Sequence, residues 1–320
     1  MDKREKELRA PGGLKSARIK GKTVGDAIDK YLAENRRGIG KTKAQVLEAI
    51  KGFSLAEMAC EDVASDDLVD FARALADGRG PSTVLNYLSH LSAIFAVARP
   101  AWGMPLDREA MRDAMAVCKR LGLTAKSRSR DRRPTRDEMD RLMAHFEDRW
   151  RRGRSLPMHQ VVAFALFSTR RQSEILSIRW DDLEAEHGRV LVRDMKHPGE
   201  KAGNDTWCEL PAEALRIIQA RPRKPDESRI FPYSTDAVSA AFTRACKLLE
   251  IDDLHFHDLR HEGVSRLFEM GRTIPQAASV SGHRSWQSLQ RYSHVRATGD
   301  RWEGWAWATT TGDAPSAPHS

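Results

Sequence analysis

The stretch HFHDLRHEGVSRLF, from His255 to Phe268, places three histidines and two arginines in a segment with the pattern of a buried helix. Val264, Leu267 and Phe268 fall at helical spacing from Arg260 and form an apolar face. A core helix rarely carries so many titratable side chains near its start. This segment therefore binds either a metal ion or an anion, and the rest of the sequence must distinguish the two.

Zinc is the first alternative, because His257 and His261 are four residues apart, like the histidine pair of a metalloprotease. However, the glutamate that such an enzyme needs after its first histidine is absent, and no carboxylate-rich helix follows. Two nearby arginines would also repel a dication. The sequence therefore favours an anion site, and we expect no metal and no other cofactor.

The composition favours a polyanionic partner. The chain has 320 residues, enough for two domains, a formal net charge of +8 and a pI near 9.4. No apolar run approaches the ~20 residues of a membrane span, and the charged opening MDKREKELRA is no signal peptide. The cysteines show no C-x-x-C spacing, so we expect isolated reduced thiols at Cys60, Cys118, Cys208 and Cys246. These features predict a soluble cytoplasmic protein.

The first part of the chain predicts a small helical domain. Residues 1–22 are basic and rich in glycine, and we expect a flexible arm there. Helical periodicity follows in residues 23–35, 41–53, 65–78 and 80–98, and no convincing strand precedes residue 130. Thr23 and Asp26 have the spacing of a capping box at the first helix. We therefore assign residues 23–118 to an all-helical domain.

A basic run connects this domain to the next. Residues 119–133 contain seven lysines and arginines against one aspartate, Asp131. Such a run is usually a solvated linker, but it can also lie along a phosphate backbone, and both descriptions can hold together. We expect DNA contacts here from Arg128, Arg130, Arg132 and Arg133.

The second domain, residues 134–308, is predicted to be mostly helical with one small antiparallel sheet. Strand patterns in residues 188–195 and 206–210 flank a hairpin loop at 196–205, and helical patterns surround this hairpin on both sides. Residues 309–320 are small and polar, and we expect them to be disordered. The predicted fold class is mainly α with a small antiparallel β-sheet.

Two further motifs are weak when taken alone. Arg171 and Glu174 are three residues apart and can pair on one helix face, which surface ion pairs commonly do. Lys196 begins the hairpin loop, where a lysine is usually only a solvated side chain.

Taken in order, these residues resemble the signature of the tyrosine recombinases, the phage integrase family. The order is R-x-x-E, a hairpin lysine, H-x-L-R, G-H and a tyrosine nine residues later, represented here by Arg171 with Glu174, Lys196, His257 with Arg260, His283 and Tyr292. The motifs extend over about residues 134 to 298. One departure is Ser168-Thr169, where members often have T-G; it can alter the local backbone but removes no catalytic group.

The resemblance implies a SAM-like core-binding domain followed by a recombinase catalytic domain, and a role for each residue. Tyr292 would attack a DNA phosphate and form a 3′-phosphotyrosyl link without metal or ATP. Arg171 and Arg260 would hold the phosphate, because the guanidinium fork matches two of its oxygens. The resemblance further makes His283 a donor to a nonbridging oxygen, Lys196 the general acid, His257 the acceptor of the tyrosine proton and Glu174 an orienting group. His255 and His261 would be structural or close to DNA.

The expected function is site-specific recombination of double-stranded DNA, as integration, excision or inversion, in a bacterial or phage-encoded, nucleoid-associated protein. A homodimer on each site and a homotetramer at synapsis are implied. The alternatives are a type IB topoisomerase-like enzyme and a catalytically silent DNA-binding regulator. We place base reading near Asn86 and His90. The segment RWEGWAW, 301–307, either folds back on its own domain or docks on a neighbouring protomer.

Overall fold

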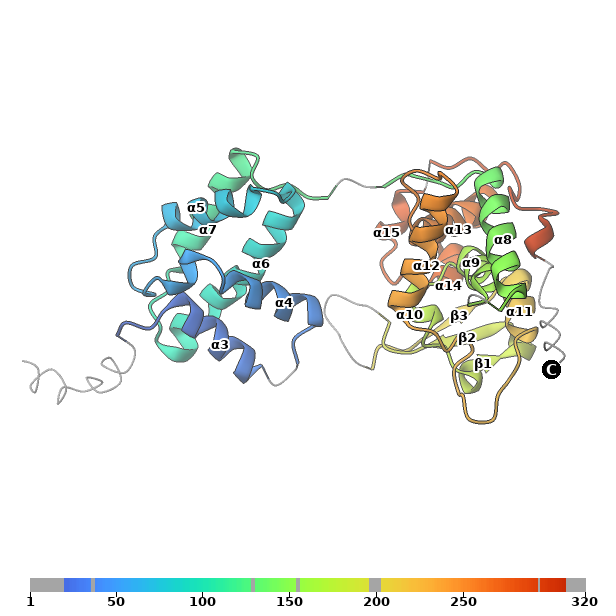
Figure 1. Cartoon of the computed structure of the whole chain (residues 1–320), viewed down its shortest axis with the longest axis horizontal. Coiled ribbons are helices and arrows are strands. Elements are labelled where there is room, and N and C mark those ends of the chain that lie inside the picture. Colours follow the sequence, from blue (N-terminus) through green and yellow to red (C-terminus); the bar gives the residue numbers. More distant parts are fainter. Residues whose placement is uncertain are drawn as a thin grey trace, which may run out of the picture. The chain divides into compact units, whose positions relative to one another are not determined.

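The computed structural model describes residues 20–35, 38–127, 130–153, 156–195, 203–292 and 294–308. The chain divides into two compact units, residues 1–129 and 130–320, which are described separately below. Helices dominate both units, and the described strands form one small antiparallel sheet, so the predicted fold class is confirmed (Figure 1). None of the helices in these ranges is both long and apolar enough to cross a membrane.

The described part of the first unit is helical. Its elements are α3 (Val24–Glu34), α4 (Lys41–Ile50), η1 (Ser54–Glu57), α5 (Ser65–Ala76), α6 (Pro81–Val97), η2 (Ala98–Trp102) and α7 (Arg108–Arg120). The capping box expected at the start of the first helix is present, since Thr23 and Asp26 exchange hydrogen bonds between side chain and backbone. The apolar stripe of α6 is buried in the core of this unit, with Val84, Leu88 and Leu91 all 0% exposed.

One helix of this unit lacked a sequence prediction. Helix α7 contributes Met111, Ala114 and Cys118 to the core and packs against α5 and α6. It continues to Arg120, so the basic run expected at 119–133 begins inside a helix and ends inside the second unit. Most of the predicted arm (residues 1–19) and the predicted tail 309–320 lie outside the described residues.

The second unit surrounds a helix that is buried on all sides. Its helices are α8 (Arg136–Arg151), α9 (Met158–Ser168), α10 (Gln172–Ile175), α11 (Ala212–Gln219), α12 (Thr235–Leu248), α13 (Asp258–Glu269), α14 (Ile274–Ser281) and α15 (Gln287–Gln290), with short turns η3 (Trp180–Asp182), η4 (Ala185–His187) and η5 (Ala306–Ala308). Every residue of α9 is buried, and α8, α11 and α13 pack around it. Such a helix, apolar all round, forms the centre of a domain rather than its surface.

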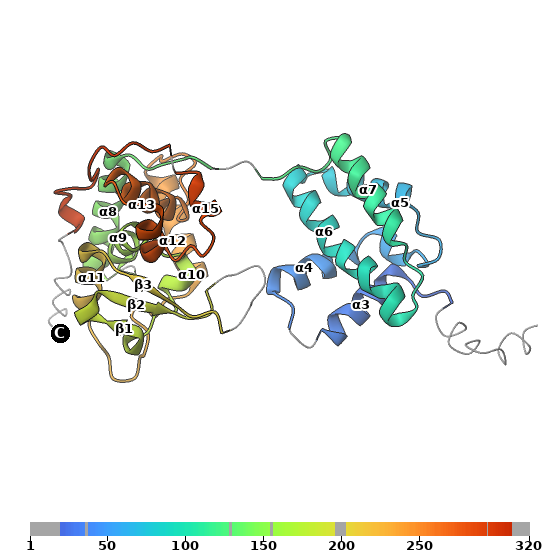
Figure 2. The ribbon, with the colours of Figure 1, turned by 180° about the vertical axis from the view of Figure 1, so that it is seen from behind.

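The sheet of the second unit consists of β1 (Leu183–Glu184), β2 (Arg189–Val192) and β3 (Thr206–Glu209) in the order β1-β2-β3. All pairs are antiparallel, with Leu183 opposite Val190 and Val190 opposite Cys208. The sheet lies at one end of this unit, with α14 packed against β3 (Figure 2). The β2–β3 hairpin was predicted, whereas β1 is too short for its alternation to appear in the sequence.

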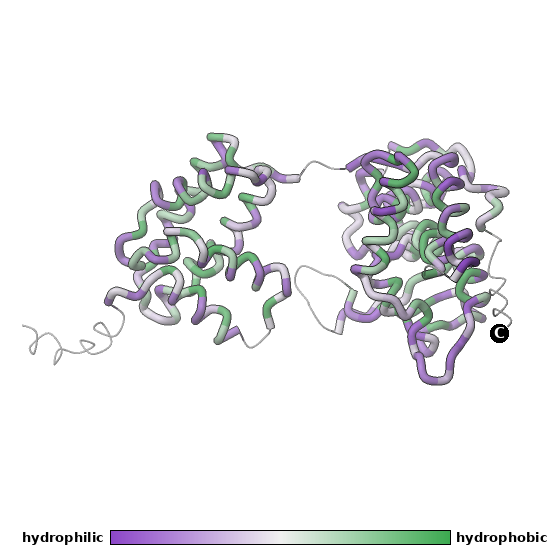
Figure 3. Tube along the Cα trace, viewed as in Figure 1, coloured by the Kyte–Doolittle hydropathy of each residue, from purple (hydrophilic) through white to green (hydrophobic). Residues whose placement is uncertain are grey.

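Helix α13 approaches α9 unusually closely. A Cβ on Gly263 would lie 2.1 Å from the carbonyl oxygen of Leu166 and 2.9 Å from Cγ2 of Thr169, so only glycine fits at this crossing. In both units hydrophobic and hydrophilic residues alternate along the helices (Figure 3). The crossing brings the start of α13 next to the end of α9, where the expected catalytic motifs meet.

The tryptophans near the end of the described chain fold back on their own unit. Trp302 is 1% exposed and Trp305 is 2% exposed, and both belong to the core built around α9. Their indole nitrogens donate to Glu262 at 2.8 Å and to Asp140 at 2.6 Å. Of the two alternatives for this segment, the structure therefore favours folding back, because the rings of Trp302 and Trp305 are buried within the same chain.

Candidate active site

The first motif is built on the turn that ends α9. Arg171 caps α10, because its backbone nitrogen donates to Glu174 Oε2 at 3.0 Å. The Arg171 side chain donates to Glu174 Oε1 at 2.5 Å and stays partly exposed. Burial opposes the ionisation of Glu174, but the charges of Arg170, Arg171 and Arg260 outweigh it and lower its pKa. The R-x-x-E pair is thus a partly buried charge cluster rather than a surface ion pair.

Arg260 is held from three sides in the first turns of α13. Its guanidinium donates to the carbonyl oxygens of Thr169 at 2.5 Å and Ser281 at 3.1 Å, and it lies 4.0 Å from Glu174 Oε2. The Arg260 residue is 4% exposed. Desolvation, followed by the charges of Arg170 and Arg171, lowers the pKa of Arg260 to about 9. The cation therefore persists at neutral pH, and an added anion would stabilise it.

His283 completes this anion-binding cluster. Its Nε2 lies 3.1 Å from Arg260 Nη2 and its Nδ1 lies 2.7 Å from Ser281 Oγ. Desolvation and the charge of Arg260 lower the pKa of His283 to about 3, so the ring is neutral at pH 7. Gly282 adopts φ +68° before it, and a Cβ there would meet the Met195 and Arg170 side chains. The G-H motif therefore needs glycine for both its backbone angle and its space.

Tyr292 lies in the turn after α15 and packs against residues of α13. Its hydroxyl is hydrogen-bonded to Nδ1 of His261 at 2.7 Å, and its ring stacks on Phe268 with centroids 5.9 Å apart. Tyr292 is 7% exposed, and this burial raises its pKa. Desolvation lowers the pKa of His261 to about 4, so at neutral pH its ring is uncharged and one of its nitrogens can accept a hydrogen bond.

The hydrogen-bond partner of Tyr292 differs from the histidine that the resemblance implied. The resemblance gave His257 as the acceptor of the tyrosine proton and made His261 structural or close to DNA, whereas the Tyr292 hydroxyl is hydrogen-bonded to His261. The exposed His257 ring lies 5.0 Å from the His261 ring at 90°. Partial desolvation and the charges of Arg260 and Arg171 lower the pKa of His257. Sequence spacing placed both histidines on one helix face, but only the tertiary fold shows which of them reaches the tyrosine.

The metal alternative rested on the same two histidines. Across the described ranges there is no group of three or more histidine, cysteine, aspartate or glutamate side chains arranged to hold a metal ion.

Arg170 precedes Arg171 in the sequence, and the R-x-x-E spacing selected Arg171 of this doublet, so Arg170 was given no role. It is 1% exposed, and its guanidinium donates to the carbonyl oxygens of Ser168 and Val280 and to Cys208 Sγ. Val280 is near the end of α14, directly before the G-H motif. The doublet Arg170-Arg171 thus separates into a buried arginine and a partly exposed one, as the R-x-x-E spacing suggested for Arg171.

The basic run does not offer the free cations that were expected of it. Arg130 pairs with Asp258 and Asp253, Arg132 pairs with Glu138, and Arg133 pairs with Glu262 and Glu269, at N–O distances between 2.5 and 2.9 Å. Arg130, Arg132 and Arg133 are thus paired with acids of their own unit, and their DNA contacts stay a prediction. Arg128 and Lys196 lie outside the described residues.

Two further features do not belong to the catalytic cluster. Asn86 and His90 are half-buried on α6 in the first unit, where desolvation and Lys43 lower the pKa of His90.

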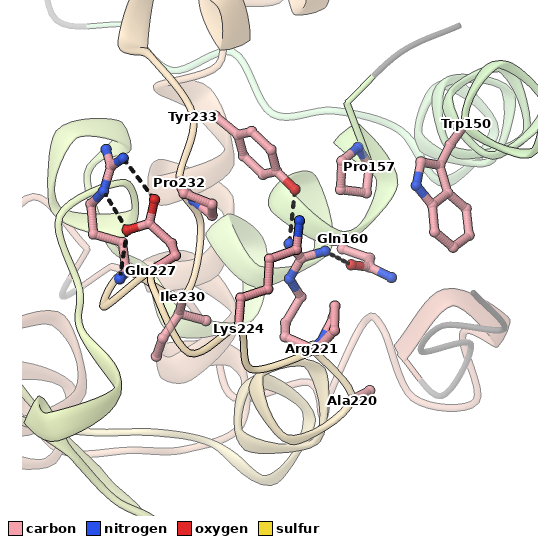
Figure 4. A pocket seen from close by; sticks show the side chains of 12 residues that line it. Trp150, Pro157, Gln160, Ala220, Arg221, Lys224, Glu227, Ile230, Pro232 and Tyr233 are labelled. Atoms are coloured by element: carbon pink, nitrogen blue, oxygen red, sulfur yellow. Dashed lines mark hydrogen bonds and ion pairs between the residues drawn. The ribbon is translucent and has the colours of Figure 1, made fainter. Parts of the chain in front are cut away.

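In the second unit, near the start of α9, a cavity of about 390 Å³ is lined by aromatic rings and prolines around Arg221 (Figure 4). Arg221 donates to Gln160 Oε1 at 2.5 Å and to the Tyr233 hydroxyl at 2.8 Å. Residues of the catalytic cluster do not line this cavity.

Known proteins resemble this chain in sequence and in fold. Residues 132–298, which are 167 of the 320, match the phage integrase family. The shufflon-specific DNA recombinase of Escherichia coli is 29% identical over 296 residues, covering 89% of this chain and 72% of that protein. The integrase of Salmonella phage P22 is 26% identical over 229 residues, covering 67% of this chain and 55% of that protein.

Solved structures agree on the fold. The Tn1549 transposon integrase in complex with a circular intermediate DNA has a TM-score of 0.64 at 14% identity, covering 84% of this chain and 94% of that chain. A lambda integrase tetramer bound to a Holliday junction has a TM-score of 0.62 at 22% identity, covering 84% of this chain and 81% of that chain. The chain described here belongs to the phage integrase family, the tyrosine recombinases, which cleave and rejoin DNA at specific sites.

Proposed function

We propose that Tyr292 of this chain attacks a backbone phosphate of double-stranded DNA and forms a 3′-phosphotyrosyl link. The observation that carries this proposal is that one unit contains both a phenol hydrogen-bonded to a neutral histidine and a cluster of two arginines and a histidine, and that the charge of Arg260 in this cluster acts on Tyr292. The first group supplies a nucleophile, and the second supplies fixed donors for an anion.

The anion site is suited to the charge that develops during this reaction. Attack on a phosphodiester gives a doubly charged, five-coordinate phosphorus, which preorganised donors stabilise more strongly than they stabilise the ground state. Arg171 is partly exposed, whereas the buried Arg260 is fixed by two backbone carbonyls and lies beside His283. We assign Arg171 and Arg260 to the nonbridging oxygens. From the family resemblance we assign His283 as a further donor through Nε2, which requires its proton to move from Nδ1, where it now faces the Ser281 hydroxyl, to Nε2. Glu174 orients both arginines.

The proton steps then balance as follows. The Tyr292 oxygen bonds to phosphorus as the bond from phosphorus to the 5′ oxygen breaks, and the tyrosine proton moves to a histidine. The 2.7 Å hydrogen bond supports His261 as the acceptor in the DNA-free protein, with His257 next to it. From the family resemblance we assign Lys196 as the acid that protonates the 5′ oxygen. Attack by a 5′ hydroxyl reverses these steps, so rejoining needs no ATP.

Recombination requires two DNA sites, and therefore more than one protomer. The solved relatives include a lambda integrase tetramer on a Holliday junction. We propose that two copies of this chain bind each site and that four assemble at synapsis, acting on the DNA of a bacterium or phage. The relatives named integrase and shufflon-specific recombinase support integration or inversion as the outcome.

Covalent trapping tests this proposal directly. Sheared DNA from the source organism is incubated with the purified full-length protein, the reaction is stopped with detergent, and DNA bound covalently to protein is sequenced to locate the cleavage site. A duplex of that site is then prepared with a nick beside the scissile phosphate, so that cleavage releases a short piece of the leaving strand. Because this piece diffuses away and cannot be rejoined, the covalent adduct accumulates. We expect an adduct on the 3′ end, unaffected by EDTA.

Tyr292→Phe should abolish the adduct while DNA binding stays within about twofold, because only the nucleophilic oxygen is removed. Tyr233→Phe is the matched control, since Tyr233 lies in the separate cavity beside Arg221 (Figure 4) and should form adduct at the wild-type rate. An adduct formed by Tyr292→Phe protein would exclude Tyr292 as the nucleophile. A relaxed plasmid without recombinant products from two sites would identify a topoisomerase instead.

A further inference from the structure

The first residues of the second unit form a strap across the helix that carries the candidate catalytic histidines. This arginine strap, residues 130–133, is anchored at Arg130, which grips Asp258 with two hydrogen bonds of 3.1 and 2.9 Å. The same guanidinium donates to the Asp253 carboxylate at 2.9 Å and to the Asp253 carbonyl oxygen at 2.7 Å. Arg130 is therefore fixed by four contacts, although its side chain is 33% exposed.

Asp258 links this anchor to His257. Asp258 is 0% exposed and begins α13, immediately after His257. Its Oδ2 accepts a hydrogen bond from the backbone nitrogen of His255 at 2.8 Å, which closes the turn that carries His257. A buried carboxylate that loses its only ionic partner must be neutralised or must move. The position of His257 therefore depends on Arg130.

Two more contacts connect the strap to catalytic neighbours. Arg133 donates to Glu262 at 2.6 and 3.0 Å, and Glu262 follows His261. Arg291, which precedes Tyr292, donates to the carbonyl oxygen of Arg130 at 2.7 Å and to Asp131 Oδ1 at 2.9 Å. The strap thus contacts the sequence neighbours of three candidate catalytic residues: His257, His261 and Tyr292.

We propose that Arg130 is a positioning residue for the cleavage step, acting through Asp258 on His257 and through its own backbone on the Tyr292 turn. This inference rests on the proposed function. The Arg130 guanidinium is held by Asp258 and Asp253 of its own unit, so its replacement should change the rate of chemistry rather than the affinity for DNA. The strap follows the first unit directly along the chain. A displacement of the strap would therefore also displace the turn that carries Tyr292.

Arg130→Gln and Asp258→Asn test this proposal in the full-length protein. At saturating DNA, each should lower the single-turnover rate of adduct formation on the nicked duplex by about 10- to 100-fold, because small displacements of reacting groups have effects of that size. The dissociation constant and its dependence on salt should stay within about twofold of wild type. The double variant should be no slower than the slower single variant, as expected for residues that act through one contact.

Arg151→Gln is the matched control, because it removes the same charge from an ion pair of the same unit, but its partner is Glu147 near the end of α8. Its cleavage rate should stay within about twofold of wild type. Arg130→Lys keeps the charge without the two-pronged grip, and we expect it to restore less than half of the lost rate on a logarithmic scale. Thermal melting shows that each variant is folded; if Arg130→Gln is not, Arg130→Lys and Asp258→Asn replace it.

Three results would overturn the inference: a wild-type rate in Arg130→Gln, an equal loss in Arg151→Gln, or a loss accompanied by weaker and less salt-sensitive DNA binding. The last result would make Arg130 a phosphate contact. If wild-type protein formed no adduct at all, the proposed function itself would fail, and this outcome is distinct from the other three.

Discussion

At the scale of single residues, Thr169 shows how the fold tolerates an unfavourable backbone in order to place the arginines. It ends α9 with φ +57°, a left-handed conformation that disfavours a β-branched side chain. It is fully buried, and its Oγ1 has no hydrogen-bond partner among the described residues. Its carbonyl oxygen nevertheless accepts the hydrogen bond that fixes Arg260.

Replacing Thr169 with glycine should therefore raise the free energy of unfolding by about 1 kcal/mol. Relief of the left-handed strain and of the buried hydroxyl outweighs the lost methyl contacts and the greater freedom of the unfolded chain. Chemical denaturation measures this difference. Ser265→Gly is the control, because Ser265 is buried inside α13 at negative φ and its replacement should destabilise by about 1 kcal/mol. A destabilised Thr169→Gly protein would show that the turn is not strained.

The residues of the anion cluster could be selected from the sequence through the family resemblance, because each of its motifs lies within a short stretch of chain. The R-x-x-E spacing places Glu174 where it caps its own turn at Arg171, and the H-x-x-R spacing places two side chains one turn apart. The partner of Tyr292 could not be predicted in this way. His257 and His261 share one helix face, and the position of the turn after α15 selects between them.

At the scale of elements, the hairpin and most helices followed from apolar periodicity, but helix α7 and the partners of the charge run did not. The three arginines of the strap find most of their acids between Asp253 and Glu269, more than 100 positions further along the chain. A run of like charges looks the same in sequence whether it is solvated, lies on DNA or is paired internally. The pairing became visible only when α13 was placed beside the strap.

The tryptophan segment is the element on which we expect the second unit to depend most. Trp302→Ala should reduce the free energy of unfolding by about 3–5 kcal/mol, because it leaves a large cavity and removes a donor from buried Glu262. Denaturant midpoints provide the measurement. Trp286→Ala is the matched control: Trp286 is 58% exposed, and its loss should change stability by no more than about 0.5 kcal/mol.

Truncation after Thr298 tests the same contacts together. It should leave the second unit unfolded or strongly destabilised, since Asp300, Trp302 and Trp305 all contact core residues. A stable truncated protein that only failed to assemble on DNA would instead favour docking on a neighbouring protomer.

At the scale of the whole molecule, the excess of basic residues predicted a polyanionic partner, but it does not describe how the charges are used. Many arginines of the second unit stabilise the fold by pairing with acids, while Arg171 and Arg260 share one glutamate and keep an excess positive charge. The net charge of +8 is a sum over the whole chain, and it therefore understates how much more positive the site is than its surroundings. Locating that difference requires the tertiary structure.

Histidine burial makes the stability of the whole molecule sensitive to mild acid. Desolvation lowers the pKa of His159 and His261 to about 4 and that of His283 to about 3. In the unfolded chain these rings titrate near ~6.5. Between about pH 6.5 and 4 the unfolded chain therefore binds protons that the folded chain does not, so stability falls as the pH is lowered through this window. Carboxylates with lowered pKa, such as Glu174 and Asp300, extend the loss below that range.

His159 allows this linkage to be measured outside the active site. It is 2% exposed, its ring lies against Trp150 and its Nδ1 has no hydrogen-bond partner among the described residues. Phenylalanine fits the same aromatic contact without a titrating group. Wild-type protein should lose stability steadily from pH 7 to pH 4.5, and His159→Phe should lose it less steeply, by up to about 1.4 kcal/mol per pH unit. Denaturant unfolding at a series of pH values measures both slopes. Equal slopes would mean that His159 binds a proton without unfolding the protein, and that its burial does not limit stability in acid.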